Sequence, residues 1–202
     1  IFKLYFKAKS EFTQKSGILL IPFFYVTILF CLLVGLFSEE LLFILTTSEF
    51  HSAYPIIIPL VMIYGIYFFG STGQLLLAKK SKLISRISFA TLFFNIIFNY
   101  PMIKYYGAEG ASWATFFSGL IIALISFYLS QKHAKINFPS HFIWTVLLFL
   151  ISLMLNYFLL KFNFSYSFRL IFKLLNVFAY LLLLHKMNIF VIISKLLKAN
   201  KL

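Results

Sequence analysis

The chain has very few acidic residues: its 202 residues include no aspartate, and its acidic side chains are five glutamates. Charged residues of both signs make up only 11% of the sequence, whereas a soluble globular domain has about 25%. Cys31 is the single cysteine, so an intrachain disulfide is excluded. Together with a hydrophobic content of 62%, these shortages exclude a soluble globular domain.

Signatures of enzymatic chemistry are also missing. The sequence contains no HExxH, CxxC, GxxxxGK[ST] or GxSxG motif, and no apolar run holds a pair of carboxylates. The four histidines lack the spacing of metal ligands. No connection between apolar runs is long enough to form a catalytic domain. We therefore predict that the protein is not an enzyme and binds no cofactor or metal.

Six long apolar runs fill the chain instead. Crossing a hydrocarbon core about 30 Å thick takes about 20 residues of helix, which satisfies its own backbone hydrogen bonds in lipid. The runs cover residues 17–37, 53–78, 83–103, 108–130, 141–160 and 168–184. The expected fold is an all-α integral membrane protein, with a bundle of six transmembrane helices at residues 17–185. A basic segment, 1–16, precedes the bundle, and a basic amphipathic tail, 186–202, follows it.

The basic residues are distributed unequally between the two sides of this expected topology. The net charge of +13 is concentrated in short connections, which favours a topogenic role over nucleic-acid binding. One side receives Lys3, Lys7, Lys9, Lys15, Lys79, Lys80, Lys82, Arg86, Lys132, Lys135, Lys186, Lys195, Lys198 and Lys201, and the other receives Lys104, Lys161 and Arg169. The positive-inside rule then predicts that both ends of the chain are cytoplasmic.

The two terminal segments carry their own signals. In the tail, Lys195 and Lys198 lie opposite a helical face made of Ile189, Ile193, Leu196 and Leu197, which predicts a helix on the anionic inner leaflet. The opening residues do not resemble a signal peptide, because no small-residue cleavage site follows the first apolar run. Because the chain opens with Ile1 in a basic loop, we expect it to be a piece of a longer protein.

Polar residues inside the apolar runs are the candidate functional residues. Arg169, Lys173, Asn176 and Tyr180 form one stripe of a helix, which must face a cavity, a partner helix or the outer headgroups. Arg86 either reaches the headgroups or points inward to an anionic substrate. The candidates for a substrate cavity, chosen from position alone, are Arg86, Lys173, Gln74, Asn95, Asn99 and Asn176.

Some polar and small residues have a simpler structural explanation. Asn95 and Asn99 share a helical face and should contact protein, and Gln74 binds either a ligand or a neighbouring helix. Gly110, Ala114 and Ser118 recur every four residues and predict a close helix contact. Glu39 and Glu40 could bind a coupling cation, but ordinary outward-facing negative charge is the simpler interpretation. Their segment either continues the first helix or lies at the outer interface.

Three stretches between residues 43 and 132 resemble a known transporter family. They are SEFHSAYP from Ser48, QLLLAKKSK from Gln74, and NIIFNYPMIKYYGAEGASWAT from Asn95. In this order they resemble the C-terminal half of bacterial polysaccharide flippases, in the multidrug/oligosaccharidyl-lipid/polysaccharide exporter superfamily. The third stretch is the most informative, with two asparagines, a short outer turn and a Gly-x-x-Gly-Ala helix start. The last two apolar runs resemble the family in hydropathy alone.

The resemblance implies one lobe of a twelve-helix transporter in the bacterial inner membrane. Such a protein moves polyprenyl-pyrophosphate-linked oligosaccharide repeat units, as in O-antigen, lipopolysaccharide or capsule synthesis, by alternating access. The implied partners are the lipid-linked substrate, membrane lipids, an N-terminal lobe of the same chain and other polysaccharide-assembly proteins. Three alternatives remain open: a cation-coupled multidrug exporter of the same superfamily, a membrane glycosyltransferase, polymerase or ligase, and an assembly subunit.

Overall fold

The computed structural model describes the chain except for residues 1–8, 68–72, 140 and 188–202, and it describes no side chain at 9–19, 73 or 77. Every regular element in the described part is a helix. The helices are α2 Lys9–Leu36, α3 Ser38–Leu45, the 3-10 helix η1 Ser48–Ala53, α4 Tyr54–Tyr67, α5 Gly73–Leu77, α6 Ser81–His133, α7 His141–Lys161 and α8 Tyr166–Lys186. Most of the predicted amphipathic tail lies outside the described residues.

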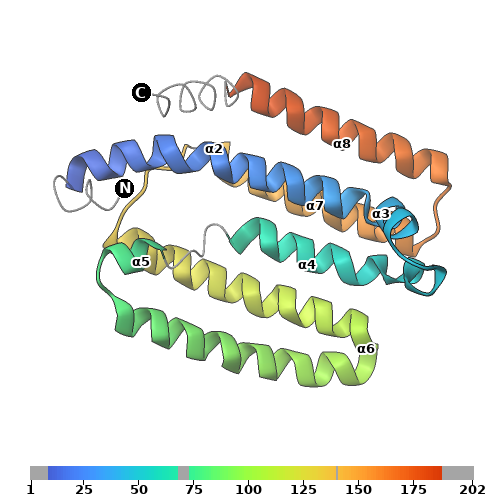
Figure 1. Ribbon diagram of the computed structural model, residues 1–202, viewed down its shortest axis with the longest axis horizontal. Coiled ribbons are helices and arrows are strands. Elements are labelled where there is room, and N and C mark those ends of the chain that lie inside the picture. The colour runs from blue at the N-terminus through green and yellow to red at the C-terminus, as the bar shows by residue number, and fades with distance from the viewer. Residues whose placement is uncertain (1–8, 68–72, 140, 188–202) are drawn as a thin grey trace.

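The long helices run side by side as a bundle (Figure 1). Helix α4 lies at its centre and contacts α2, α6 and α7, while α8 packs against α2 and α7. The largest apolar core joins these five helices, with Phe24, Ile63, Phe149 and Leu184 among its buried members. A smaller core around Leu75 holds α5 against α6.

Helix α6 is two antiparallel helices joined at Gly107. As a straight helix its 53 residues would extend about 80 Å, far beyond the hydrocarbon thickness of a bilayer. The chain reverses at Gly107, where φ is 58° and ψ is −136°, a conformation that favours glycine (Figure 1). The predicted small-residue stripe is buried in the second half, and its Gly110 lies directly against Met102 of the first half.

One predicted run, residues 53–78, is interrupted, and a bend follows the first run. After α2 the chain bends by 71° into α3, so residues 38–45 form a separate helix. The run at 53–78 contains two helices, α4 and α5, on either side of the undescribed residues 68–72. The first helix also begins at Lys9, eight residues before the predicted start of the first run at 17.

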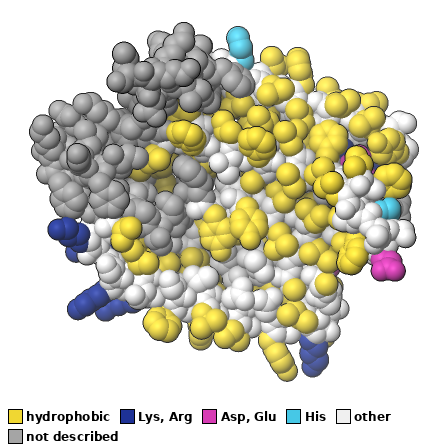
Figure 2. All heavy atoms as spheres, viewed as in Figure 1, with side chains coloured by type: hydrophobic (Ala, Val, Ile, Leu, Met, Phe, Trp, Pro, Cys, Tyr) yellow, Lys and Arg dark blue, Asp and Glu magenta, His cyan; other side chains and the backbone are white. Residues whose placement is uncertain are grey.

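The described helices have the length and the surface of a membrane protein. Four stretches are long and apolar enough to cross a bilayer, namely η1 with α4, α6, α7 and α8, and the bent pair α2–α3 is a fifth if it counts as one span. Only 17% of the most apolar 18-residue stretch of α8 is buried within the protein, so most of this helix needs an apolar surrounding. Apolar side chains also cover much of the face seen in Figure 2. These features indicate a helical membrane protein.

The two ends of the bundle differ in charge. At one end, here called the basic end, lie the α5–α6 turn, the α6–α7 connection and the last turn of α8 (Figure 1). Its described side chains include Lys79, Lys80, Lys82, Arg86, Lys132, Lys135 and Lys186. The opposite end, here called the mixed-charge end, carries α3, η1, the turn at Gly107 and the α7–α8 connection. There Glu39, Glu40, Glu49 and Glu109 accompany Lys104, Lys161 and Arg169.

Candidate functional site

The candidate site is a charged cluster at the bend between α2 and α3. Glu39 and Glu40 occupy the first turn of α3, where the helix dipole favours negative charge. Their side chains are partly exposed, at 30% and 22%. Both face α8, which runs alongside the bend and contributes two cationic side chains, Arg169 and Lys173. The cluster therefore joins residues that are about 130 positions apart in the sequence.

Lys173 is the most unusual member, because its side chain is completely buried. Its ammonium group donates to both carboxylate oxygens of Glu40, at 2.6 and 2.8 Å. A third carboxylate oxygen, Oε2 of Glu39, lies 3.7 Å from the same nitrogen, and the ring centroid of Phe37 lies 5.7 Å away. Because removing an ion from water is costly, a buried lysine needs such neighbouring negative charge.

Arg169 completes the cluster. Its Nη1 donates to Glu39 Oε2 at 2.9 Å, and its side chain is only 13% exposed. Two cations therefore meet two carboxylates, and the cluster carries no formal net charge. In this structure Glu39 pairs with Arg169 and Glu40 with Lys173. The coupling-cation interpretation instead assigned the two carboxylates to a bound ion. The described part of the chain holds no group of three or more metal-ligating side chains.

The remaining members of the predicted stripe on α8 also contact neighbouring helices. Asn176 accepts a hydrogen bond from Ser152 of α7 at 2.6 Å, and its own amide donates to the Phe172 carbonyl. The hydroxyl of Tyr180 donates to the carbonyl of Tyr25 in α2 at 3.0 Å. The stripe is therefore real, and it faces partner helices along its whole length.

Asn156 of α7 reinforces the bend from the other side. Its amide, fully buried, donates to the carbonyls of Gly35 and Leu36 at 3.1 and 3.3 Å. These are among the last carbonyls of α2, and the final carbonyls of a helix lack intrahelical partners. Gly35 is also closely packed, because a Cβ there would lie 2.6 Å from Leu153. Helix α7 thus holds the end of α2, and α8 holds the start of α3.

A second polar group lies at the mixed-charge end. Glu109, just after the turn in α6, accepts a hydrogen bond from the Tyr157 hydroxyl of α7. Lys161 donates to Tyr157 at 3.1 Å and lies 3.4 Å from Glu109. The Lys161 side chain is 56% exposed, so this ion pair contributes little to stability. The group connects the α6 turn to α7.

The other four candidates lie in separate places. Gln74 is buried and donates to the carbonyl of Ala134 at 2.5 Å, so it binds the α6–α7 connection. Asn99 donates to Asn95 at 2.6 Å, and Asn95 approaches Ser118 at 3.5 Å across the α6 hairpin. Arg86 is exposed at the basic end. The six candidates therefore do not converge on one cavity.

The residues that sequence reasoning missed are the acidic partners of the cluster. The lysine count had already placed Glu39, Glu40 and Arg169 on one side of the membrane. A lysine buried among apolar residues requires a counter-charge. The assignment of Glu39 and Glu40 to the same side as Arg169 was therefore the sequence signal that could have predicted this pairing. For the pair of Glu109 with Tyr157 we find no comparable signal in the sequence.

Comparison with known proteins adds no assignment. No protein-family model, curated protein or solved structure matches this chain. The flippase resemblance therefore remains a prediction from three short stretches of sequence.

Proposed function

We propose that this chain is one lobe of a membrane transporter that exports lipid-linked oligosaccharide repeat units. The observation that carries the transporter class is the charged cluster at the bend of an interrupted helix. Charged residues inside membrane bundles are rare and mark transport pathways. Interrupted helices whose ends contribute to the binding site are typical of secondary transporters. The substrate class rests on the sequence resemblance.

The proposed topology has six spans and cytoplasmic ends. The reversal at Gly107 supports counting the two halves of α6 as separate spans, and the bend at Phe37 leaves α2–α3 as one. The basic end is placed in the cytoplasm by the positive-inside rule. The mixed-charge end, with the candidate site, then faces outward.

Labelling from outside the cell tests this orientation. Ser165 is exposed in the α7–α8 connection at the mixed-charge end. In a Cys31→Ala background, Ser165→Cys is expected to react with a membrane-impermeant maleimide in intact cells. Lys135→Cys, in the α6–α7 connection at the basic end, is the matched control and should react only after lysis. The reverse labelling pattern would invert the topology.

In this transporter the charged cluster changes partners during the cycle. Lys173 and Arg169 are bound to carboxylates in the conformation described here. An anionic pyrophosphate offers the same type of acceptor for charge-assisted hydrogen bonds. We propose that substrate replaces Glu40 at Lys173 when the bundle opens, so that the buried charge is never left without a partner.

Genetic complementation tests the function. Deleting the gene in its source bacterium should abolish surface polysaccharide, measured by gel electrophoresis of extracted polysaccharide. The intact gene should restore it, Lys173→Met should not, and Lys104→Met at an exposed residue should. Normal surface polysaccharide in a clean deletion strain would argue against the proposal. Sensitivity of that strain to cationic dyes would favour a drug exporter instead.

A further inference from the structure

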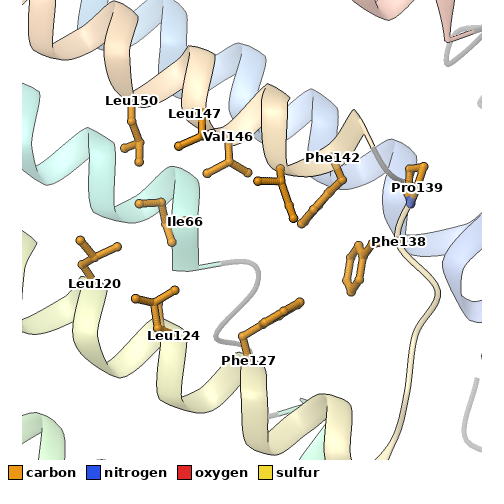
Figure 3. Close-up of a pocket in the computed structure, with 12 residues that line it drawn as sticks. Ile66, Leu120, Leu124, Phe127, Phe138, Pro139, Phe142, Val146, Leu147 and Leu150 are labelled. Atoms are coloured by element: carbon orange, nitrogen blue, oxygen red, sulfur yellow. The ribbon is translucent and has the colours of Figure 1, made fainter.

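A large apolar groove lies in the half of the bundle nearer the basic end, away from the charged cluster. Its volume is about 510 Å³, and its lining residues come from α4, the second half of α6, the α6–α7 connection and α7. Figure 3 shows Ile66, Leu120, Phe127, Phe138, Phe142 and Leu150 around this space. Protein interiors are close-packed, and this volume is that of a ligand site rather than a packing defect.

The apolar lining of the groove favours a hydrocarbon ligand. Every residue that lines the groove in the described part of the chain is apolar. Water would find few polar partners among these residues, so water does not fill such a space favourably. At the rim, Leu124 and Ile143 are 61% and 65% exposed, so the groove opens sideways on the face that meets lipid. A hydrocarbon chain can therefore enter from the bilayer.

The length and position of the groove match one leaflet. Along α7 it extends from Phe142 to Leu150, which is about 12 Å of helix. Half of a hydrocarbon core about 30 Å thick is about 15 Å. Its lining includes Phe138 and Pro139 of the α6–α7 connection, at the basic end of the bundle. The groove thus covers the depth of an acyl chain in the leaflet at that end.

Positive charge at the basic end favours a lipid with an anionic headgroup. Lys135 is exposed in the connection whose Phe138 and Pro139 line the groove, and Lys132 is exposed in the last turn of α6. The Gln74 side chain holds this connection through Ala134. We propose that the groove binds one acyl chain of an anionic phospholipid, whose phosphate lies against Lys132 and Lys135. The occupant is a resident bilayer lipid, and its binding does not depend on the transport proposal.

Native mass spectrometry of the purified chain tests this site. The probes are phosphatidylglycerol and phosphatidylcholine with identical acyl chains, added separately to protein in detergent. We expect about tenfold preference for phosphatidylglycerol, because basic residues near an anionic headgroup attract it. Lys132→Glu combined with Lys135→Glu should remove this preference. Lys104→Glu, an exposed lysine at the opposite end, should retain it, and equal loss in that control would overturn the proposal.

Filling the groove tests the acyl chain separately. Ala123→Phe should lower retention of both lipids about tenfold, since it removes the apolar surface that they would bury. Leu147→Trp fills the partly exposed rim and gives a second variant if Ala123→Phe does not fold. Leu175→Trp, on an exposed part of α8, is the matched control. Unchanged retention in a folded groove-filling variant would refute the site. Both readouts measure binding, so their failure leaves the transport proposal standing.

Discussion

Replacing Glu40 with glutamine is expected to lower the free energy of unfolding by about 3 kcal/mol, because it leaves a buried ammonium group without its main partner. Lys173 is fully buried, and both oxygens of Glu40 accept its hydrogen bonds. Glu39 compensates only in part, since it lies 3.7 Å away and already binds Arg169. The measurement is unfolding in mixed detergent micelles, followed by circular dichroism.

Two further variants give this experiment its controls. Glu49→Gln makes the same change at an exposed residue of the same end and should alter stability little. The double variant Glu40→Gln/Lys173→Met removes the buried charge as well, so it should regain most of the lost stability. If Glu40→Gln behaves like Glu49→Gln, the ion pair does not hold α3 to α8. If the double variant is no better than the single one, the loss does not come from an unpaired charge.

Replacing Gly110 with valine is expected to cost about 3 kcal/mol, because a side chain there overlaps the backbone of Met102. The nearest atom is a carbonyl oxygen of the other half of α6, and a backbone atom cannot rotate away as a side chain can. The Cβ of Tyr106 lies 2.9 Å from the same position. The two halves of α6 would have to separate, and the contact between Asn95 and Ser118 would be lost with them.

The control for this variant lies two residues away. Ala108→Val adds bulk at an exposed position just after the Gly107 turn, so its effect should be small. Unfolding in mixed micelles compares the two variants under the same conditions. Equal stability of Gly110→Val and the unmodified chain would mean that the halves of α6 do not pack as closely as described.

Helix positions could be predicted from hydropathy, since α2, α4, α7 and α8 each fall largely within one predicted apolar run, and the two halves of α6 correspond to two successive runs. The interruptions were harder to predict. The chain bends by 71° between Leu36 and Ser38, although no proline lies there and Gly35 is still within α2. Two contacts hold the bend: Asn156 of α7 donates to the Gly35 carbonyl, and Lys173 of α8 donates to Glu40 of α3. Local sequence carries no record of such distant partners.

The sequence by itself determined the membrane class, the approximate helix ranges and the gathering of basic residues at one end. These properties depend on composition and on the order of charges along the chain, which any fold preserves. Only the tertiary structure decided what the polar residues contact. For Lys173 and Asn176 the sequence left a cavity, a partner helix and the outer headgroups open, because periodicity states which face a residue occupies and not what lies opposite. Packing of α8 against α2, α3 and α7 placed Glu40, Ser152 and Tyr25 opposite that face.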